Sequence, residues 1–217
     1  MKERILVTGG TGYIGSHTVV ELQNSGYDVV IVDNLSNSSA DVVDNIEKVS
    51  GIRPAFEKLD CLDLEGMDKL FTKYPGIKGI IHFAASKAVG ESVQKPLLYY
   101  RNNLVSLINL LELMPKHGVE GIIFSSSCTV YGQPDVLPVT EEAPIKKAES
   151  PYGNTKQINE EIIRDTVASG SPINAIMLRY FNPIGAHSTA LIGELPNGVP
   201  QICYLMLLRQ RWVFVKN

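Results

Sequence analysis

The sequence lacks the features that define several classes of protein. Its 217 residues include only three cysteines, Cys61, Cys128 and Cys203, and no two of them form a CxxC pair. An odd, scattered set favours free thiols in a reducing compartment over a disulfide or zinc framework. The four histidines have no ligand spacing, so no metal site is predicted. His82 lies within an apolar run and is predicted to be a packed core residue.

Basic charge and long apolar runs are also missing. The formal net charge is -3 at pH 7, which gives no basic footprint and argues against a nucleic-acid partner. No apolar run approaches the roughly 18 to 20 residues that cross a bilayer. The charged start of the chain is followed by only a short apolar stretch before Thr8, too short for a signal-peptide core. The sequence therefore predicts a cytoplasmic protein with no membrane partner.

What the sequence does contain is a regular alternation of short apolar runs and longer amphipathic stretches. The predicted strands are 5–8, 29–33, 55–59, 79–84, 121–125 and 174–179, and the predicted helices lie near 13–25, 40–50, 64–73, 94–116 and 151–168. The strand runs lack polar alternation, which suits strands buried on both faces of a parallel sheet. Strand–helix alternation over six strands predicts an α/β fold, a doubly wound Rossmann-like sheet, over residues 1–182.

The first motif is the run TGGTGYIG, residues 8–15, which follows the first predicted strand and opens a helix. A pyrophosphate binds backbone N–H groups at a helix N-terminus, where the helix dipole favours negative charge. Side chains would hold it off, so glycine is required where the backbone approaches the ligand. A tight turn is the alternative, but the strand–turn–helix context favours phosphate binding at Gly9, Gly12 and Gly15.

The second motif is Asp33, which closes the next predicted strand 24 residues after Gly9. A carboxylate there can accept hydrogen bonds from the adenosine ribose hydroxyls and would repel a 2′-phosphate. A solvated turn acid is the alternative, because Asp33-Asn34 is also good turn chemistry. Beside the glycine turn, ribose binding is favoured, and NAD is predicted over NADP.

The third motif joins Tyr152 and Lys156, four residues apart on one predicted helix face, to the serines that end at Ser127. A free tyrosine titrates near 10, too high for a base at neutral pH. A nearby ammonium and a cationic nicotinamide both favour the phenolate, and a serine hydroxyl can bind the same substrate oxygen. A plain helix-surface pair is the alternative. Cys128 is a tempting nucleophile, but no histidine base can be assigned to it and a packing role is favoured.

All three motifs follow the carboxyl ends of predicted strands. So do the segment 83–87 and the residue Asn182. Doubly wound folds bind their ligands at that edge of the sheet. Agreement at one edge supports a single composite site more strongly than any one motif does.

Six segments also carry a resemblance: VTGGTGYIGSH (7–17), IHFAA (81–85), KAVGESVQKP (87–96), SSSCTVYG (125–132), SPYGNTK (150–156) and LRYFNPIGAH (178–187). They resemble the UDP-glucose 4-epimerase family of extended short-chain dehydrogenases/reductases. The chain departs from that family's usual residues at Ala85-Ser86, Cys128 and Asn154-Thr155. The resemblance implies NAD contacts beyond the glycines at Tyr13, Ile14, Asp33, Asn34, Leu35, Ser36, Asn37, Ser38, Asp60, Cys61, Phe83, Ala84, Ala85, Ser86, Lys87, Asn102, Ser127, Tyr152, Lys156 and Phe181.

The same resemblance implies chemistry and partners. Ser127, Tyr152 and Lys156 match the family's catalytic positions, and Lys87, Ser127, Tyr152 and Asn182 match contacts to a UDP-sugar. Epimerisation at C4 would pass through a 4-keto sugar, with hydride held on NAD. Dehydration is disfavoured, because an Asp-Glu pair does not follow Thr129. The helices near 94–116 and 151–168 resemble those that pair subunits, which implies a homodimer. The alternative function is an inactive or non-catalytic NAD-binding fragment.

The end of the sequence departs from the resemblance. Residues 183–201 are expected to begin a substrate-binding region, and residues 202–217 to form an aberrant tail, with the C-terminal substrate domain largely missing. Adding one A before a suitable back-translation of residues 202–217 yields Asn-Leu-Leu-Pro-Tyr-Ala-Thr-Gln-Thr-Ala-Val-Gly-Ile-Arg-Glu-Lys, which resembles the family there. The hypothesis is a one-base deletion, in the gene or its sequencing, just after Gln201. The coding DNA tests it, since the downstream frame should encode the rest of the domain. Read literally, the apolar tail predicts poor solubility.

Overall fold

The computed structural model describes residues 2–195. Its strands are β1 (Arg4–Thr8), β2 (Asp28–Asp33), β3 (Ala55–Lys58), β4 (Ile77–His82), β5 (Gly121–Ser127) and β6 (Asn174–Tyr180). Its helices are α1 (Tyr13–Asn24), α2 (Asp41–Ser50), α3 (Leu64–Lys73), α4 (Val89–Gln94), α5 (Pro96–Lys116) and α6 (Pro151–Ala168), with a short 3-10 helix, η1 (Cys128–Tyr131). The predicted strand–helix alternation is confirmed.

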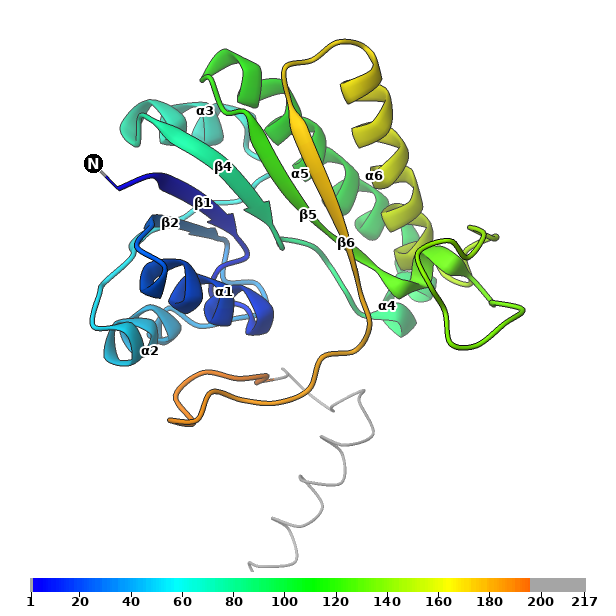
Figure 1. Ribbon diagram of the computed structural model, residues 1–217, viewed down its shortest axis with the longest axis horizontal. Coiled ribbons are helices and arrows are strands. Elements are labelled where there is room, and N and C mark those ends of the chain that lie inside the picture. The colour runs from blue at the N-terminus through cyan, green and yellow to red at the C-terminus, as the bar shows by residue number, and fades with distance from the viewer. Residues whose placement is uncertain (1, 196–217) are drawn as a thin grey trace, which may run out of the picture.

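The six strands form one parallel sheet in the order β3-β2-β1-β4-β5-β6. Thr8 at the end of β1 pairs with Val32 on one side and His82 on the other, so β1, β2 and β4 end at the same level. The chain winds outward from β1 to β3 and then from β4 to β6 (Figure 1). The strand order reverses between β1 and β4, and doubly wound sheets bind ligands outside the carboxyl ends of strands at such a point.

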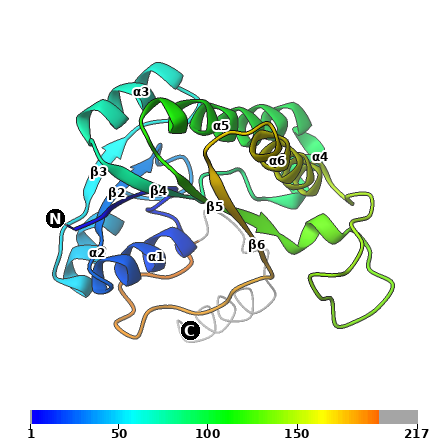
Figure 2. The same cartoon turned by 45° about the horizontal axis from the view of Figure 1, so that its top comes forward.

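Helices cover both faces of the sheet (Figure 2). On one face, Met67 of α3, Leu110 of α5 and Ile163 of α6 pack with β-strand residues into one buried cluster. On the other face, Val19 of α1 and Ile46 of α2 belong to a second cluster that includes β1 and β2. Burying each such side chain contributes about 1.5–3 kcal/mol to the stability of the fold. The two helix layers therefore fix the sheet, and with it the positions of the strand ends at its carboxyl edge.

Two expectations need correction. The helix predicted near 94–116 is α5, which begins at Pro96, and the separate helix α4 directly before it was not predicted; Pro96 cannot donate the hydrogen bond that would join the two into one helix. The expectation that every strand is buried on both faces is wrong for β6, where Ile176 is 57% and Leu178 39% exposed. The helices α1 and α2 cover that face of the sheet only over the strands near β1.

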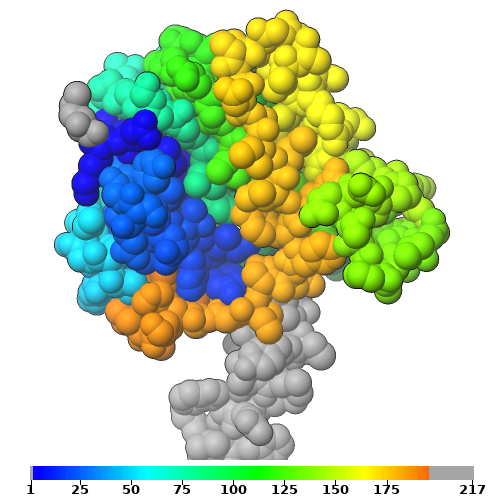
Figure 3. Space-filling model, in the orientation of Figure 1, coloured from blue at the N-terminus to red at the C-terminus, as the bar shows by residue number. Residues whose placement is uncertain are grey.

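After β6 the chain crosses below the carboxyl edge of the sheet toward α1 (Figures 1 and 3). We call residues 181–195 the strap. An antiparallel bridge between Ala186 and Gly193 folds the strap back on itself, and Ile192 is buried in the cluster that contains Val19 and Val20. Among residues 2–195, no helix is long and apolar enough to cross a membrane.

Candidate active site

The glycine turn joins β1 to α1 by very close backbone contacts. Gly9 has a positive φ of 69°, and a Cβ placed on it would lie 2.7 Å from the Ala84 nitrogen. A Cβ on Gly15 would lie 2.2 Å from the Gly9 carbonyl oxygen. Both positions therefore require glycine, as the sequence predicted. The turn brings the first residues of α1 to the level where β1 and β4 end.

Among residues 2–195, no side chain caps the N-terminus of α1. The N-cap residue is Gly12, and the first turn of the helix, which begins with Tyr13 and Ile14, contains no acidic residue. By contrast, Asp63 caps α3 and Ser150 caps α6 with side-chain oxygens. A helix start with free N–H groups at the carboxyl edge of a sheet suits an anion such as a pyrophosphate.

Asp33, the last residue of β2, organises the loop that follows it. Its Oδ1 accepts hydrogen bonds from the Leu35 nitrogen at 2.9 Å and the Ser38 hydroxyl at 3.2 Å. Its Oδ2 accepts from the Thr11 nitrogen at 3.2 Å, which ties the carboxylate to the glycine turn. The remaining acceptor capacity of the carboxylate is available to a ribose hydroxyl.

The rest of the predicted adenosine shell lies around Asp33. Asn34 donates from Nδ2 to Oδ2 of Asp60 at 2.9 Å, which joins the loops after β2 and β3. Cys61 is buried, and burial raises the pKa of its thiol to about 12, so it is an inert packing group. Ser36 and Asn37 are exposed on the same loop. No lysine or arginine lies between Asp33 and Ser38, so the loop carries no cation for a 2′-phosphate.

The segment after β4 closes the far side of the glycine turn. Ala84 and Ala85 are half-buried, and Phe83 donates its backbone N–H to the Thr8 carbonyl oxygen. Ser86 accepts a hydrogen bond on Oγ from Nδ2 of Asn102 at 3.2 Å. This hydrogen bond holds Asn102 of α5 against the loop. The family resemblance implies that Ser86 and Asn102 both contact the cofactor.

The three predicted catalytic residues come together at the end of β5. Ser127 is the last residue of that strand, while Tyr152 lies in the first turn of α6 and Lys156 one turn later. The Lys156 ammonium lies 5.8 Å from the centre of the Tyr152 ring and donates to the Ser125 carbonyl oxygen at 2.6 Å. It also lies 4.8 Å from the centre of the Phe124 ring. The spacing-based expectation of one shared helix face is confirmed.

Burial dominates the electrostatics of this group. It raises the pKa of Tyr152, and the hydrogen bond with Ser127 only partly offsets that effect. Burial lowers the pKa of Lys156 to about 8. We expected the ammonium to favour the phenolate, but Lys156 points to Ser125 and the protein groups alone hold the tyrosine pKa above its ordinary value. A positive charge on a ligand is the remaining way to lower it.

Other residues singled out in the sequence behave as packing groups or lie at the rim. His82 is 2% exposed and its Nδ1 lies 2.7 Å from the Thr8 hydroxyl, which confirms a core role. Burial lowers its pKa to about 3, so it stays neutral. Cys128, directly after Ser127, opens η1 and is only half-buried. Phe181 and Asn182 are exposed at the start of the strap, so the structure places them at the edge of the group and not within it.

The strap contacts the site at two places that the sequence did not reveal. Lys87 forms an ion pair with Glu194 at 3.2 Å, which links the loop after β4 to the strap. The ring centre of His187, in the strap, lies 6.3 Å from that of His17. His17 in turn packs edge-on against Tyr13, with their ring centres 5.5 Å apart. Both contacts join residues far apart in the sequence, so no local sequence motif could predict them.

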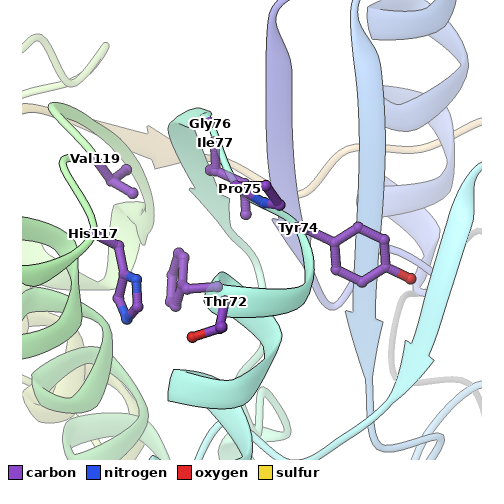
Figure 4. Close-up of a pocket in the computed structure, with 8 residues that line it drawn as sticks. Thr72, Tyr74, Pro75, Gly76, Ile77, His117 and Val119 are labelled. Atoms are coloured by element: carbon purple, nitrogen blue, oxygen red, sulfur yellow. The ribbon is translucent and has the colours of Figure 1, made fainter.

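A separate pocket lies at the opposite, amino-terminal edge of the sheet (Figure 4). It is formed by the end of α3, the start of β4 and the segment after α5, and its lining residues are Phe71, Thr72, Tyr74, Pro75, Gly76, Ile77, His117 and Val119. None of the predicted site residues lines it. The candidate site is therefore the composite surface at the carboxyl edge, not this pocket.

A doubly wound sheet with a glycine turn, an acid at the end of β2 and a Ser–Tyr–Lys group defines the class of short-chain dehydrogenases/reductases. The chain belongs to the NAD dependent epimerase/dehydratase family, whose pattern matches residues 5–201. It is 52% identical over 196 residues to the UDP-glucose 4-epimerase of Bacillus subtilis and 49% identical over 206 residues to that of Homo sapiens.

The fold is shared with solved structures of such enzymes. The UDP-glucose 4-epimerase of Stenotrophomonas maltophila, solved with bound NAD and formylated UDP-arabinopyranose, superposes with a TM-score of 0.94 at 45% identity over 98% of this chain. The Bifidobacterium longum enzyme, in complex with NAD+ and UDP, gives a TM-score of 0.91 at 46% identity over 94% of this chain. The matches cover 62% and 61% of those two chains. The sequence match to the Bacillus enzyme covers 90% of this chain but only 57% of that enzyme. The match to the human enzyme covers 92% of this chain and 59% of the human protein.

Proposed function

We propose that the chain binds NAD along the carboxyl edge of its sheet and uses Ser127, Tyr152 and Lys156 to interconvert UDP-glucose and UDP-galactose at C4. The observation that carries the proposal is the meeting of these three side chains at the end of β5, on the same carboxyl edge of the sheet as the glycine turn. The high identity to UDP-glucose 4-epimerases supports the choice of substrate.

The protein groups fit NAD. The uncapped start of α1 suits the pyrophosphate, and the Gly9 and Gly15 positions leave no room for a Cβ. Asp33 suits the adenosine ribose, and the loop that follows it carries no cation for a phosphate. The solved relatives in complex with NAD support the same assignment. We assign the dinucleotide-binding domain to residues 1–182 and the start of the sugar-binding region to residues 183–201, of which 196–201 lie outside the described residues, as do 202–217.

The residues of the chain divide the proton chemistry among them. NAD, when bound, supplies a hydride acceptor that can also return the hydride. Tyr152, as the phenolate, accepts the proton of the sugar 4-hydroxyl and later gives it back. Ser127 hydrogen-bonds the same oxygen and the phenol, while the Lys156 ammonium, 5.8 Å from the centre of the tyrosine ring, is held by the Ser125 carbonyl oxygen. The residues that follow Thr129 in η1 are Val130 and Tyr131, so no acid pair is present there to eliminate water.

A second candidate function is NAD binding without epimerisation. The exposure of Phe181 and Asn182 favours it, because the residue expected to hold the UDP-sugar is not enclosed by described residues. Under this alternative the glycine turn and Asp33 would still bind the dinucleotide, and the catalytic group would receive no sugar.

A coupled assay for conversion of UDP-galactose to UDP-glucose, run on the full 217-residue chain with NAD, tests the proposal. We expect turnover that falls by about 100-fold or more in Tyr152→Phe, since general-base catalysis contributes that much. The control is NAD affinity by calorimetry, which the substitution should leave within about threefold. NAD binding with no turnover in the parent chain would support the second candidate, and no NAD binding would refute both.

We further propose that the chain pairs with a second copy through α5 and α6. A shallow groove between these helices is lined by Ile108, Leu111, Glu112, Ile162 and Thr166, and Val105 and Ile108 are each 37% exposed there. Exposed apolar side chains in one area mark association surfaces. Light scattering should give twice the chain mass, and Ile108→Glu should reduce it to a single chain.

A further inference from the structure

The three consecutive serines at the end of β5 each have a different partner on α6. The Ser125 carbonyl oxygen accepts a hydrogen bond from the Lys156 ammonium, and the Ser127 hydroxyl is hydrogen-bonded to Tyr152. The middle serine, Ser126, donates its hydroxyl to Oε1 of Glu160 at 2.6 Å. The first two contacts belong to the proposed catalytic group, whereas the third has no part in it.

Their partners lie on one face of α6. Tyr152, Lys156 and Glu160 are spaced four residues apart, so successive members sit one turn further along the same stripe of the helix. Strand β5 is thus bonded to three successive turns of α6, at Tyr152, Lys156 and Glu160. Glu160 makes the contact furthest along the helix from the reacting end.

Glu160 is held from several directions. It is 1% exposed, and Arg179 of β6 donates to both of its oxygens, from Nε at 2.9 Å and from Nη2 at 2.8 Å. Arg164, one turn later on α6, donates to Oε2 at 2.7 Å. The Arg179 guanidinium also lies 4.7 Å from the centre of the Tyr131 ring in η1. One carboxylate therefore ties together α6, β5 and β6, and through Arg179 it reaches η1.

We propose that Glu160 is a positioning residue, which with Ser126 and Arg179 fixes the register of α6 on β5 and so holds the Tyr152 hydroxyl against Ser127. This inference rests on the proposed function, because it concerns the same catalytic group. Taking the Glu160 carboxylate and most of the Arg179 guanidinium out of water is costly, and apolar contacts of similar volume often give equal or better stability. What the charged network adds is a fixed geometry, since a bidentate pair admits one arrangement only.

The contacts of Glu160 offer a matched control. Ser126→Ala removes the bond between α6 and β5, and Ser126→Thr restores a hydroxyl at the same place. Arg164→Gln removes an ion pair to the same carboxylate, but one made within α6, so it costs stability without loosening the helix from the strand. Glu160→Gln removes the charge that Arg179 requires. If Glu160→Gln does not fold, the Ser126 pair decides the question.

The first measurement is the pKa of the Tyr152 phenol in the full chain, from the phenolate absorbance after subtraction of the same titration in the Tyr152→Phe background. Weakening the Ser127–Tyr152 hydrogen bond raises that pKa further, because among residues 2–195 this bond is the contact that lowers it. We expect Ser126→Ala to raise it by about 0.5 to 1 unit, the worth of one hydrogen bond, and Ser126→Thr to return it. Arg164→Gln should lower the melting temperature and leave the pKa unchanged.

The second measurement is steady-state kinetics of the same variants. We expect Ser126→Ala and Glu160→Gln to lower kcat by about 10-fold or more with KM nearly constant, because a misplaced base affects the transition state and not substrate binding. Arg164→Gln should keep kcat within about twofold. The proposal is overturned if the Ser126 and Arg164 variants lose stability alike and neither moves the Tyr152 pKa.

The two measurements separate this inference from the proposed function. The titration needs no sugar and no turnover, so it tests the register of α6 even in a chain that converts nothing. A parent chain without turnover, but with the expected pKa shifts, would refute epimerisation and keep Glu160 as the residue that positions Tyr152.

Discussion

The two halves of the candidate site are built in different ways. Between β1 and α1 the site is made of backbone: Gly9 and Gly15 bring a strand end and a helix start into contact, and no side chain caps the helix. Between β5 and α6 it is made of side chains, with the buried Lys156 and Glu160 held by hydrogen bonds from other elements.

This difference has consequences for stability. The backbone half depends chiefly on the space that glycine leaves free, where an added Cβ would overlap neighbouring backbone. The side-chain half buries an ammonium and a carboxylate that must be satisfied by partners. We therefore expect the backbone half to fail through steric overlap, and the side-chain half to carry electrostatic strain that some substitutions relieve.

The largest expected effect comes from placing a methyl group in the backbone half. In Gly15→Ala the new Cβ would lie 2.2 Å from the Gly9 carbonyl oxygen, so the turn must open. We expect a loss of about 3 kcal/mol in the free energy of unfolding, the upper range for overpacking. NAD affinity should fall by about 100-fold, measured by calorimetry. These two effects should occur together, because one contact sets both.

Gly90→Ala provides the control for this substitution. Gly90 lies in α4, its φ is not positive, and an added Cβ would meet nothing within 4 Å. Stability should stay equal or rise by up to about 1 kcal/mol, since alanine favours helix more than glycine does. If Gly15→Ala behaved like Gly90→Ala, the turn would not depend on close backbone contact.

The comparison also explains what the sequence could predict. The glycine turn and Asp33 are local: a strand, a turn and a helix follow one another, and the spacing of the glycines carries the signal. The group of Ser127, Tyr152 and Lys156 was also predicted, because Tyr152 and Lys156 are four apart on one helix and Ser127 follows a predicted strand. These assignments stay predictions, although the structure brings the residues together as expected.

The remainder of the side-chain half could not be predicted in this way. Glu160 continues the spacing of Tyr152 and Lys156, but its meaning depends on Arg179, which arrives on another strand. The pair Lys87–Glu194 spans more than a hundred residues. The open face of β6 was missed because apolar residues alone do not show whether a helix covers them. Long-range pairing and coverage are decided by the tertiary fold, not by local pattern.

In the side-chain half we expect a substitution that raises the free energy of unfolding, where Gly15→Ala lowers it, and by a somewhat smaller amount. Lys156→Met removes a fully buried ammonium whose pKa is lowered by burial from 10.5 to about 8. At pH 7 we expect unfolding free energy to rise by about 1–3 kcal/mol, after the loss of the Ser125 hydrogen bond is discounted. Turnover should be lost at the same time, so stability and activity move in opposite directions.

The pH dependence of that gain provides its own check. Between pH 8 and 10.5 the unfolded chain binds more protons than the folded one, so the stability of the natural chain rises with pH. The advantage of Lys156→Met is full below about pH 8 and disappears above about pH 10.5. Lys48→Met, at an exposed lysine of α2, should not show the gain, because that ammonium is already in water. Denaturant unfolding across this range gives the answer, and a constant difference at every pH would contradict a buried charge.

The smallest effect comes from the caps of two helices, of which α6 belongs to the side-chain half and α3 to neither half. Asp63→Ala and Ser150→Ala each remove one side-chain hydrogen bond to a helix N–H, to Gly66 at 2.9 Å and to Gly153 at 3.1 Å. Each should cost about 1 kcal/mol in the free energy of unfolding. Ser150 caps α6, whose first turn contains Tyr152, so its loss should also lower kcat by a few fold, because the cap holds the turn that carries the base. Asp63→Ala should leave kcat unchanged at the same loss of stability. Equal effects of both variants on kcat would mean that catalysis follows overall stability and not the placement of α6.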